Sequence, residues 1–380
     1  MGKPEKKEEN EKISIEKAIE KTGYVLEHKV ASMLEKENWS VIHNRYYLDD
    51  VTELQREMDM IAYKTLLLED DVMLFTALII SCKKNSEFDW VFLTRKAPGM
   101  NVNINMLPVN FSSNVEVFNY QISEIDWSKE KFIKKYDSNS LINKMYNYNR
   151  VVFAYQEIKK SNNAPSNDSN IYSSIASLIK AQAYEVSSLK DGRKKDQKYI
   201  YNINLLSVAD LNFHELHYED DKVTTTEINR INYLNRFLIS SQEQHYKIDF
   251  IKFDSLKSVI EEYDTLHKWN INFCKTLSKD FFANVFNDYK KKTFIISKTK
   301  SQYLELVKLC YQQETGISKD FTFLLLEKDK NVLNINVSDI EAENERLNLN
   351  ERLRIKTAEW LKNNFKYSGR FTFAEDLFPF

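Results

Sequence analysis

The fold that we expect for this chain rests on two short runs, REMDMIAYK at residues 56–64 and LIISCKKN at residues 78–85. In the first run Glu57 and Asp59 lie two positions apart, and in a β-strand such side chains share one face. The second run ends a nearly continuous apolar stretch in polar residues, which is typical of a buried central strand. The two runs therefore predict neighbouring strands, the first of which carries acids.

The polar end of the second strand supplies a partner for those acids. Ser81 and Lys83 also lie two positions apart, so they share a face of their strand. If the two strands pair, an acid and an amine meet at one end of a sheet.

A helix precedes these strands. The run TGYVLEHKVASMLEKENWSV at residues 22–41 belongs to a helical pattern that is broken near Thr22, which can cap the second stretch. Glu27 lies at the edge of the stripe that would face the sheet. An acid there is costly to bury unless it finds a cation. A bound divalent metal would satisfy both Glu27 and Asp59.

Such a set of side chains is what phosphodiester hydrolysis needs. Mg²⁺ prefers oxygen ligands and is often held by one or two carboxylates, waters and a substrate phosphate. It polarises the phosphate and lowers the pKa of a bound water, and a nearby lysine can orient that water. The sequence thus predicts Asp59 as the central Mg²⁺ ligand and Glu27 as a second or water-mediated ligand. Lys83 would be the positioning cation, and Mn²⁺ would be able to replace Mg²⁺.

These runs, extended to LIISCKKNSEFDWVF at residues 78–92, resemble restriction-endonuclease-like domains of the PD-(D/E)XK superfamily over about residues 15–93. The resemblance implies an α/β fold, with a core of helix, three strands, helix and strand that forms a mixed sheet flanked by helices. The family's helix glutamate maps onto Glu27, its motif aspartate onto Asp59 and its motif lysine onto Lys83. Members are typically Mg²⁺-dependent DNA nucleases, and many act in restriction, repair or phage defence.

The chain departs from the family pattern two residues before the lysine, where Ser81 replaces the usual acid. A hydroxyl is a weaker metal ligand than a carboxylate. Either Glu57 or the main chain after Ile80 completes the coordination around Ser81, or the domain has lost catalysis. Three nearby residues could contact the nucleic acid. Arg56 would hold a phosphate or pair with an acid, and Lys84 and Asn85 would be phosphate contacts or plain surface.

The leading expectation is a Mg²⁺-dependent endonuclease that hydrolyses phosphodiester bonds in DNA, plausibly in bacterial anti-phage defence, with RNA left open as an alternative. Many relatives dimerise to cut both strands, so a homodimer is an option, although no heptad pattern marks an interface. The rival readings keep the fold without cleavage, as a nucleic-acid-binding module, or recruit a protein partner through residues 251–380.

The rest of the chain suggests two domains after a charged, disordered tail at residues 1–10. We expect the nuclease domain over 11–250, with an insertion at about 94–168, and a smaller α/β domain of unknown role over 251–380. Further helices are expected at residues 171–187, 256–277, 302–313 and 342–361, and further strands at 199–208, 213–218, 246–253, 293–297, 321–326 and 332–337.

Composition excludes several other classes. The chain has 6 glycines, whereas average usage would give roughly 27. No two of them fall within one short loop. Phosphate-binding loops and dinucleotide fingerprints need clustered glycines, so P-loop NTPases, glycine-loop kinases and Rossmann dehydrogenases are excluded. Three widely spaced cysteines indicate no disulfide framework. The formal net charge of −2, the lack of a long apolar run and the absence of a signal pattern favour a cytoplasmic protein without a membrane segment.

Overall fold

A computed structural model describes residues 14–374, apart from 21, 50–53, 100–101, 138–139, 147, 191–196 and 240–241. The tail predicted at residues 1–10 lies outside the described residues. The fold belongs to the α/β class, with mixed sheets flanked by helices.

The chain divides into two compact units, Met1–Cys274 and Lys275–Phe380. The sequence placed this boundary at 250/251, and the difference has a physical cause. Helix α8 (Leu256–Ala283) begins directly after the last strand of the first unit, and its first half packs against that sheet. The Nδ1 atom of His267 on α8, for example, lies 2.8 Å from the hydroxyl of Thr76 in a central strand.

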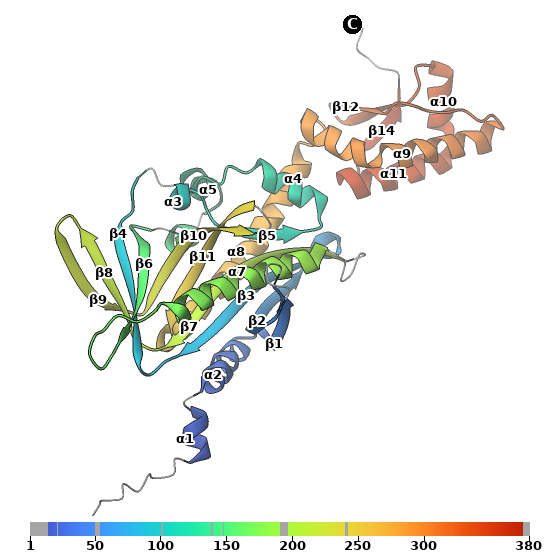
Figure 1. The fold of residues 1–380 in the computed structure, drawn as a ribbon. Coiled ribbons are helices and arrows are strands. Elements are labelled where there is room, and N and C mark those ends of the chain that lie inside the picture. Colours follow the sequence, from blue (N-terminus) through green and yellow to red (C-terminus); the bar gives the residue numbers. More distant parts are fainter. Residues whose placement is uncertain are drawn as a thin grey trace, which may run out of the picture. The chain divides into compact units, whose positions relative to one another are not determined.

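The main sheet of the first unit is mixed (Figure 1). Its strands run in the order β1-β2-β3-β7-β11-β10, and β5 pairs with β7. The pairs β3–β7 and β7–β11 are parallel, and the other pairs are antiparallel. The strands are β1 (Ser40–Leu48), β2 (Gln55–Leu67), β3 (Val72–Lys84), β5 (Asn110–Ser113), β7 (Lys198–Asp210), β10 (Arg230–Ile239) and β11 (Gln242–Lys252). Strand β3 is apolar for most of its length because it is a central strand, paired on both sides.

Helices cover both faces of this sheet. The hydroxyl of Ser174, on α7 (Ser169–Lys190), donates to the hydroxyl of Ser207 at 2.8 Å. Asn270 of α8 donates to Asn202 at 3.1 Å. Ser207 and Asn202 lie five residues apart in β7, so their side chains point to opposite faces. Helices α7 and α8 therefore sandwich the sheet, as Figure 1 shows.

At the N-terminal side, α1 (Ile15–Glu20) and α2 (Gly23–Lys36) replace one long helical pattern. The break near Thr22 is confirmed, but the predicted cap is wrong. The Thr22 hydroxyl donates to the carbonyl of Ile19 at 2.6 Å and makes no capping bond to α2. Its hydroxyl is held by the preceding turn.

A second sheet packs on the same core as α7. Its order is β6-β4-β8-β9, with a parallel β4–β8 pair between two antiparallel pairs. Trp90, Phe92 and Phe213 from this sheet are fully buried beside Ile171 of α7 and Phe250 of β11. The strands are β4 (Phe88–Lys96), β6 (Arg150–Lys159), β8 (Phe213–Glu219) and β9 (Lys222–Ile228).

Between β4 and β6 the chain forms four helices and strand β5, in the region predicted as an insertion. The helices are α3 (Val102–Asn105), α4 (Glu116–Glu124), α5 (Lys129–Tyr136) and α6 (Leu141–Tyr146). Phe132 of α5 is buried against Trp269 and Phe273 of α8. The inserted segment therefore packs on α8, which covers one face of the main sheet.

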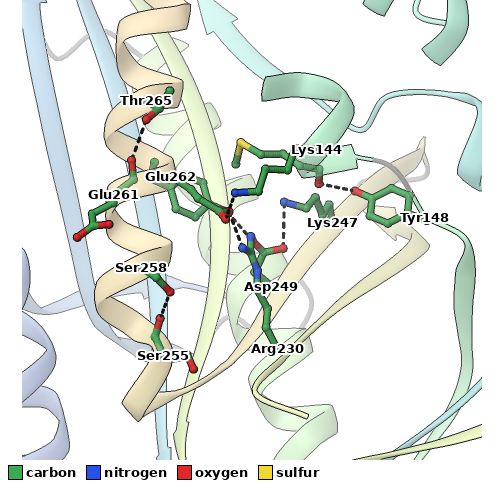
Figure 2. Close-up of polar contacts among 12 residues, drawn as sticks. Lys144, Tyr148, Arg230, Lys247, Asp249, Ser255, Ser258, Glu261, Glu262 and Thr265 are labelled. Carbon is green, nitrogen blue, oxygen red and sulfur yellow. Dashed lines mark hydrogen bonds and ion pairs between the residues drawn. The ribbon is translucent and has the colours of Figure 1, made fainter. Parts of the chain in front are cut away.

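A buried ionic network anchors α6 to the edge of the main sheet (Figure 2). Asp249 of β11 has no exposed side-chain surface and faces two cations, with Arg230 at 2.6 Å and Lys247 at 2.9 Å. Arg230 also reaches Glu262 of α8 at 2.5 Å, and Lys144 of α6 reaches Glu262 at 3.1 Å. Because each buried charge has a partner of opposite sign, the network avoids the cost of an isolated charge.

The second unit holds a small three-stranded sheet and helices. The sheet order is β12-β13-β14, and Tyr303 stacks on Trp360 between two helices with ring centroids 4.0 Å apart. The elements that lie wholly in this unit are α9 (Tyr289–Thr315), β12 (Leu325–Asp329), β13 (Val332–Asn336), α10 (Glu341–Leu349), α11 (Glu351–Phe365) and β14 (Arg370–Phe373).

Two predictions in this unit are wrong. Residues 293–297, predicted as a strand, lie inside α9, which Asp288 caps by accepting a bond from the Lys291 amide at 3.2 Å. The helix predicted over 342–361 is two helices. Asn350 separates them and caps the second, because its side chain accepts from the Leu353 amide at 2.8 Å. Among the described residues, no helix has the length and apolarity to span a membrane.

Candidate functional site

The site begins with the side chain of Asp59 at the point where β2 and β3 cease to pair. The ladder between these strands ends at the pair Met60 and Ile80. Beyond it, the main-chain amide of Cys82 donates to Oδ2 of Asp59 at 2.6 Å. This bond holds one carboxylate oxygen against β3 and fixes the orientation of the other.

Glu27, on α2, lies in the same electrostatic neighbourhood. The pKa of its half-buried carboxyl is raised, first because burial disfavours the charged form and then because Asp59 and Glu57 are negative. The positive charge of Lys83 opposes this rise. Charges on β2 and β3 therefore act on the pKa of Glu27, which lies far from them in the sequence.

The same charges act on the pKa of the buried Cys82 thiol. Cys82 is 6% exposed, and burial raises the pKa of its thiol well above the usual value. The negative charges of Asp59 and Glu27 raise this pKa further, and Lys83 lowers it. Asp59 is bonded to the amide of the residue before Lys83, and the charges of Asp59 and Lys83 both act on the pKa of Glu27. These are the three residues on which the sequence-based hypothesis depends.

Ser81 lies in β3 opposite Ser207 of β7 and is 4% exposed. Its short neutral side chain is therefore almost wholly removed from solvent. A buried hydroxyl is a weaker metal ligand than a carboxylate. Ser81 therefore does not replace the acid that the PD-(D/E)XK pattern has at this position.

Lys84 and Asn85, which were predicted as phosphate contacts or plain surface, both have partners within the protein. Lys84 is tied down, because its Nζ atom donates to the carbonyl of Glu20 at 2.8 Å and lies 3.3 Å from the carboxylate of Asp210. Asn85, a second predicted phosphate contact, accepts a bond from the Glu87 amide at 2.9 Å. Both residues thus have intramolecular partners at the end of β3.

Arg56 pairs with an acid, which is one of the two roles expected for it. Its Nε atom lies 3.6 Å from the carboxylate of Asp49, and half of the arginine side chain is exposed. Asp49 is 1% exposed and is also held by Lys180 of α7 at 2.7 Å.

Sequence reasoning missed Asp49, Lys180 and the neighbouring Tyr47. Tyr47 is buried, and its pKa is raised by burial and by Asp49, lowered by Arg56, and raised again by Asp59. The ion pair at Arg56 therefore adjoins the neighbourhood of Asp59. No sequence signal links Lys180 to Asp49, because they lie 131 positions apart.

The donor set limits which metal could bind. Among the described residues, no group of three or more His, Cys, Asp or Glu side chains is placed to hold a metal ion. A structural zinc site requires such a group, whereas Mg²⁺ is often held by one or two carboxylates with waters and phosphate. Asp59 and Glu27 are the two carboxylates of this neighbourhood that could serve as such ligands.

No family model, curated protein or solved structure matches the chain.

Proposed function

We propose that the first unit is a Mg²⁺-dependent endonuclease with a restriction-endonuclease-like core that cleaves DNA. The order of its elements supports this proposal. Helix α2 is followed by β1, β2 and β3 and then, after the inserted segment, by α7 and β7. These strands are neighbours in one mixed sheet, in the order β1-β2-β3-β7.

The observation that carries the proposal is the hydrogen bond from the Cys82 amide to Asp59, which holds this acid next to the strand end that carries Lys83. The charge of Asp59 also contributes to the raised pKa of Glu27. Two carboxylates close enough to raise a pKa repel each other, and a divalent cation between them would remove that repulsion. When bound, Mg²⁺ would polarise the scissile phosphate and make a hydroxide available near neutral pH.

The chain's own groups have separate tasks in this proposal. Asp59, oriented by the Cys82 amide, would be the first ligand of the ion. Glu27 would hold the ion directly or through a water. Lys83 offers an ammonium group that orients the attacking water and stabilises negative charge on the phosphate in the transition state. Defence against phage is the biological role that fits such a nuclease in a bacterium.

A plasmid-nicking assay tests the proposal. Wild-type protein should convert supercoiled plasmid to nicked or linear DNA in Mg²⁺ or Mn²⁺, and EDTA should stop the reaction. Asp59→Asn and Lys83→Met should each lower the rate at least about 100-fold, as expected when a metal ligand or a transition-state cation is removed.

Lys131→Met is the matched control, because it removes an exposed lysine that is paired with Asp126 and has no role in the proposed site. It should retain most of the activity. Equal losses in the Lys83 and Lys131 variants would contradict the role given to Lys83, and a wild-type protein inert in both metals would contradict the nuclease proposal.

The second candidate is a nucleic-acid-binding or partner-binding module that has lost cleavage. The buried hydroxyl of Ser81 favours it, because the site has one acid fewer than the family pattern. In that case the protein would bind DNA without cutting it in any metal, and the Asp59 and Lys83 variants would bind as the wild type does.

A further inference from the structure

The ion pairs around Asp49 join one buried acid to two partly exposed cations. Asp49 is a fully buried carboxylate at the end of β1, and two cations reach it. Arg56 is half exposed, and the side chain of Lys180 is 32% exposed. A single buried acid thus holds two cations that both remain accessible to solvent.

The orientation of Arg56 adds to this picture. Its Nε atom, rather than its terminal nitrogens, lies nearest to Asp49. The terminal nitrogens of Arg56 lie farther from this carboxylate than Nε does. The guanidinium fork can therefore engage an oxyanion in the bidentate manner that phosphate favours.

The position of this pair relative to the proposed metal site sets its role. Arg56 precedes Asp59 by three residues in β2, which corresponds to about 10 Å along a strand. That distance is about three nucleotide rises along one DNA strand. In a regular strand, residues three apart face opposite sides, but Met58 and Ile61 lie in one core, so the alternation breaks between them, where Asp59 lies. The buried Tyr47, which is paired with Arg56 in the β1–β2 ladder, senses the charges of Arg56, Asp49 and Asp59 together.

We propose that Arg56 and Lys180, held by the buried carboxylate of Asp49, form a phosphate clamp for the DNA backbone a few nucleotides from the scissile bond. This inference rests on the proposed function. It assigns Asp49 as the positioning residue and adds Lys180, from a helix far away in the sequence, to the substrate-binding surface. The clamp binds phosphate oxygens and carries no base specificity.

The test measures binding of the full chain to a fluorescein-labelled DNA duplex in EDTA, by anisotropy over a series of salt concentrations. Each lost phosphate contact should reduce the slope of log K against log salt by about 0.9. Arg56→Met and Lys180→Met should each show this reduction with weaker binding. Lys180→Arg should keep the wild-type slope and affinity, because it keeps the positive charge.

Lys131→Met is the matched control, since Lys131 is an exposed lysine paired with Asp126 at 2.5 Å on α5. Its slope should equal that of the wild type. Lys180→Met leaves Asp49 with one cation fewer, so thermal unfolding of every variant is measured alongside binding.

The double variant Asp49→Asn with Lys180→Met separates contact from folding. It removes the buried charge together with its partner, so stability should recover while DNA binding stays weak. Recovery of wild-type binding would show that Lys180 acts only on folding and would overturn the clamp. Unchanged slopes in folded Arg56 and Lys180 variants, or a wild-type chain that does not bind the duplex, would also overturn it. Because the binding assay contains no metal, it tests the clamp alone. A wild type that binds the duplex in EDTA but does not nick plasmid in Mg²⁺ or Mn²⁺ would refute the nuclease proposal and leave the clamp standing.

Discussion

The main-chain amide of Cys82 donates a 2.6 Å hydrogen bond to the carboxylate of Asp59, across the point where two antiparallel strands separate. The bond uses a backbone donor that has passed the end of the ladder, and it couples the acid to the strand that carries Ser81 and Lys83. Ser81, which stands where the PD-(D/E)XK pattern has an acid, lies one residue before this amide. The following predictions examine how the site tolerates charge.

Ser81→Asp should restore an acid to the site at a cost in stability without metal. A carboxylate at this buried position adds a negative charge to those of Glu27, Asp59 and Glu57, so the melting temperature in EDTA should fall below that of the wild type. Saturating Mn²⁺ should then raise the melting temperature of the variant more than that of the wild type. Equal metal-dependent shifts in both proteins would place Ser81 outside the metal site.

Glu27 should make the metal-free protein less stable as pH rises. Its pKa is raised in the folded state, so between the ordinary glutamate pKa and the raised value the folded state binds more protons than the unfolded state. Unfolding free energy therefore decreases with rising pH across that window and stays reduced above it. Urea titrations in EDTA at several pH values should show this decline in the wild type.

Glu27→Gln should lose that part of the pH dependence, because the amide does not titrate. Glu35→Gln, an exposed residue on the same helix, is the control and should behave as the wild type does. An identical decline in the Glu27 variant and the wild type would remove Glu27 from the charged cluster.

Asp249→Asn should destabilise the first unit severely. Asp249 is fully buried between Arg230 and Lys247, and its neutralisation leaves two cations without their shared partner. Breaking a buried pair in this way costs about 3–5 kcal/mol in urea unfolding. Glu243→Gln is the comparison, since Glu243 pairs with Arg236 on the surface and should cost at most about 1 kcal/mol. Similar small losses in both variants would show that the network is not a stabilising anchor.

The sequence was most informative where burial is simplest. Strand β3 was predicted from a continuous apolar run, because a central strand admits few polar side chains. Strand β10, with the sequence RINYLNRFLI, was missed because it is an edge strand whose apolar and polar residues follow no regular alternation. Residues 293–297 were predicted as a strand from their apolar, β-branched residues, but local propensity is weak and a capped helix overrides it.

The candidate site divides in the same way. Glu27, Asp59 and Lys83 could be selected in advance because spacing within a helix or a strand determines which side chains share a face. Asp49 and Lys180 could not, because their contact depends on where α7 crosses the sheet. Tertiary placement of this kind has no counterpart in local periodicity.

Helix α8 has a practical consequence for dissecting the molecule. The boundary between the units falls inside this helix, and its first half supplies His267 and Asn270 to a polar cluster with Thr76 and Asn202. A truncation at residue 250 would remove this first half of α8 and expose the face of the main sheet that it covers. Separate expression of the first unit should therefore retain the chain through Cys274, so that loss of solubility is not mistaken for loss of a partner.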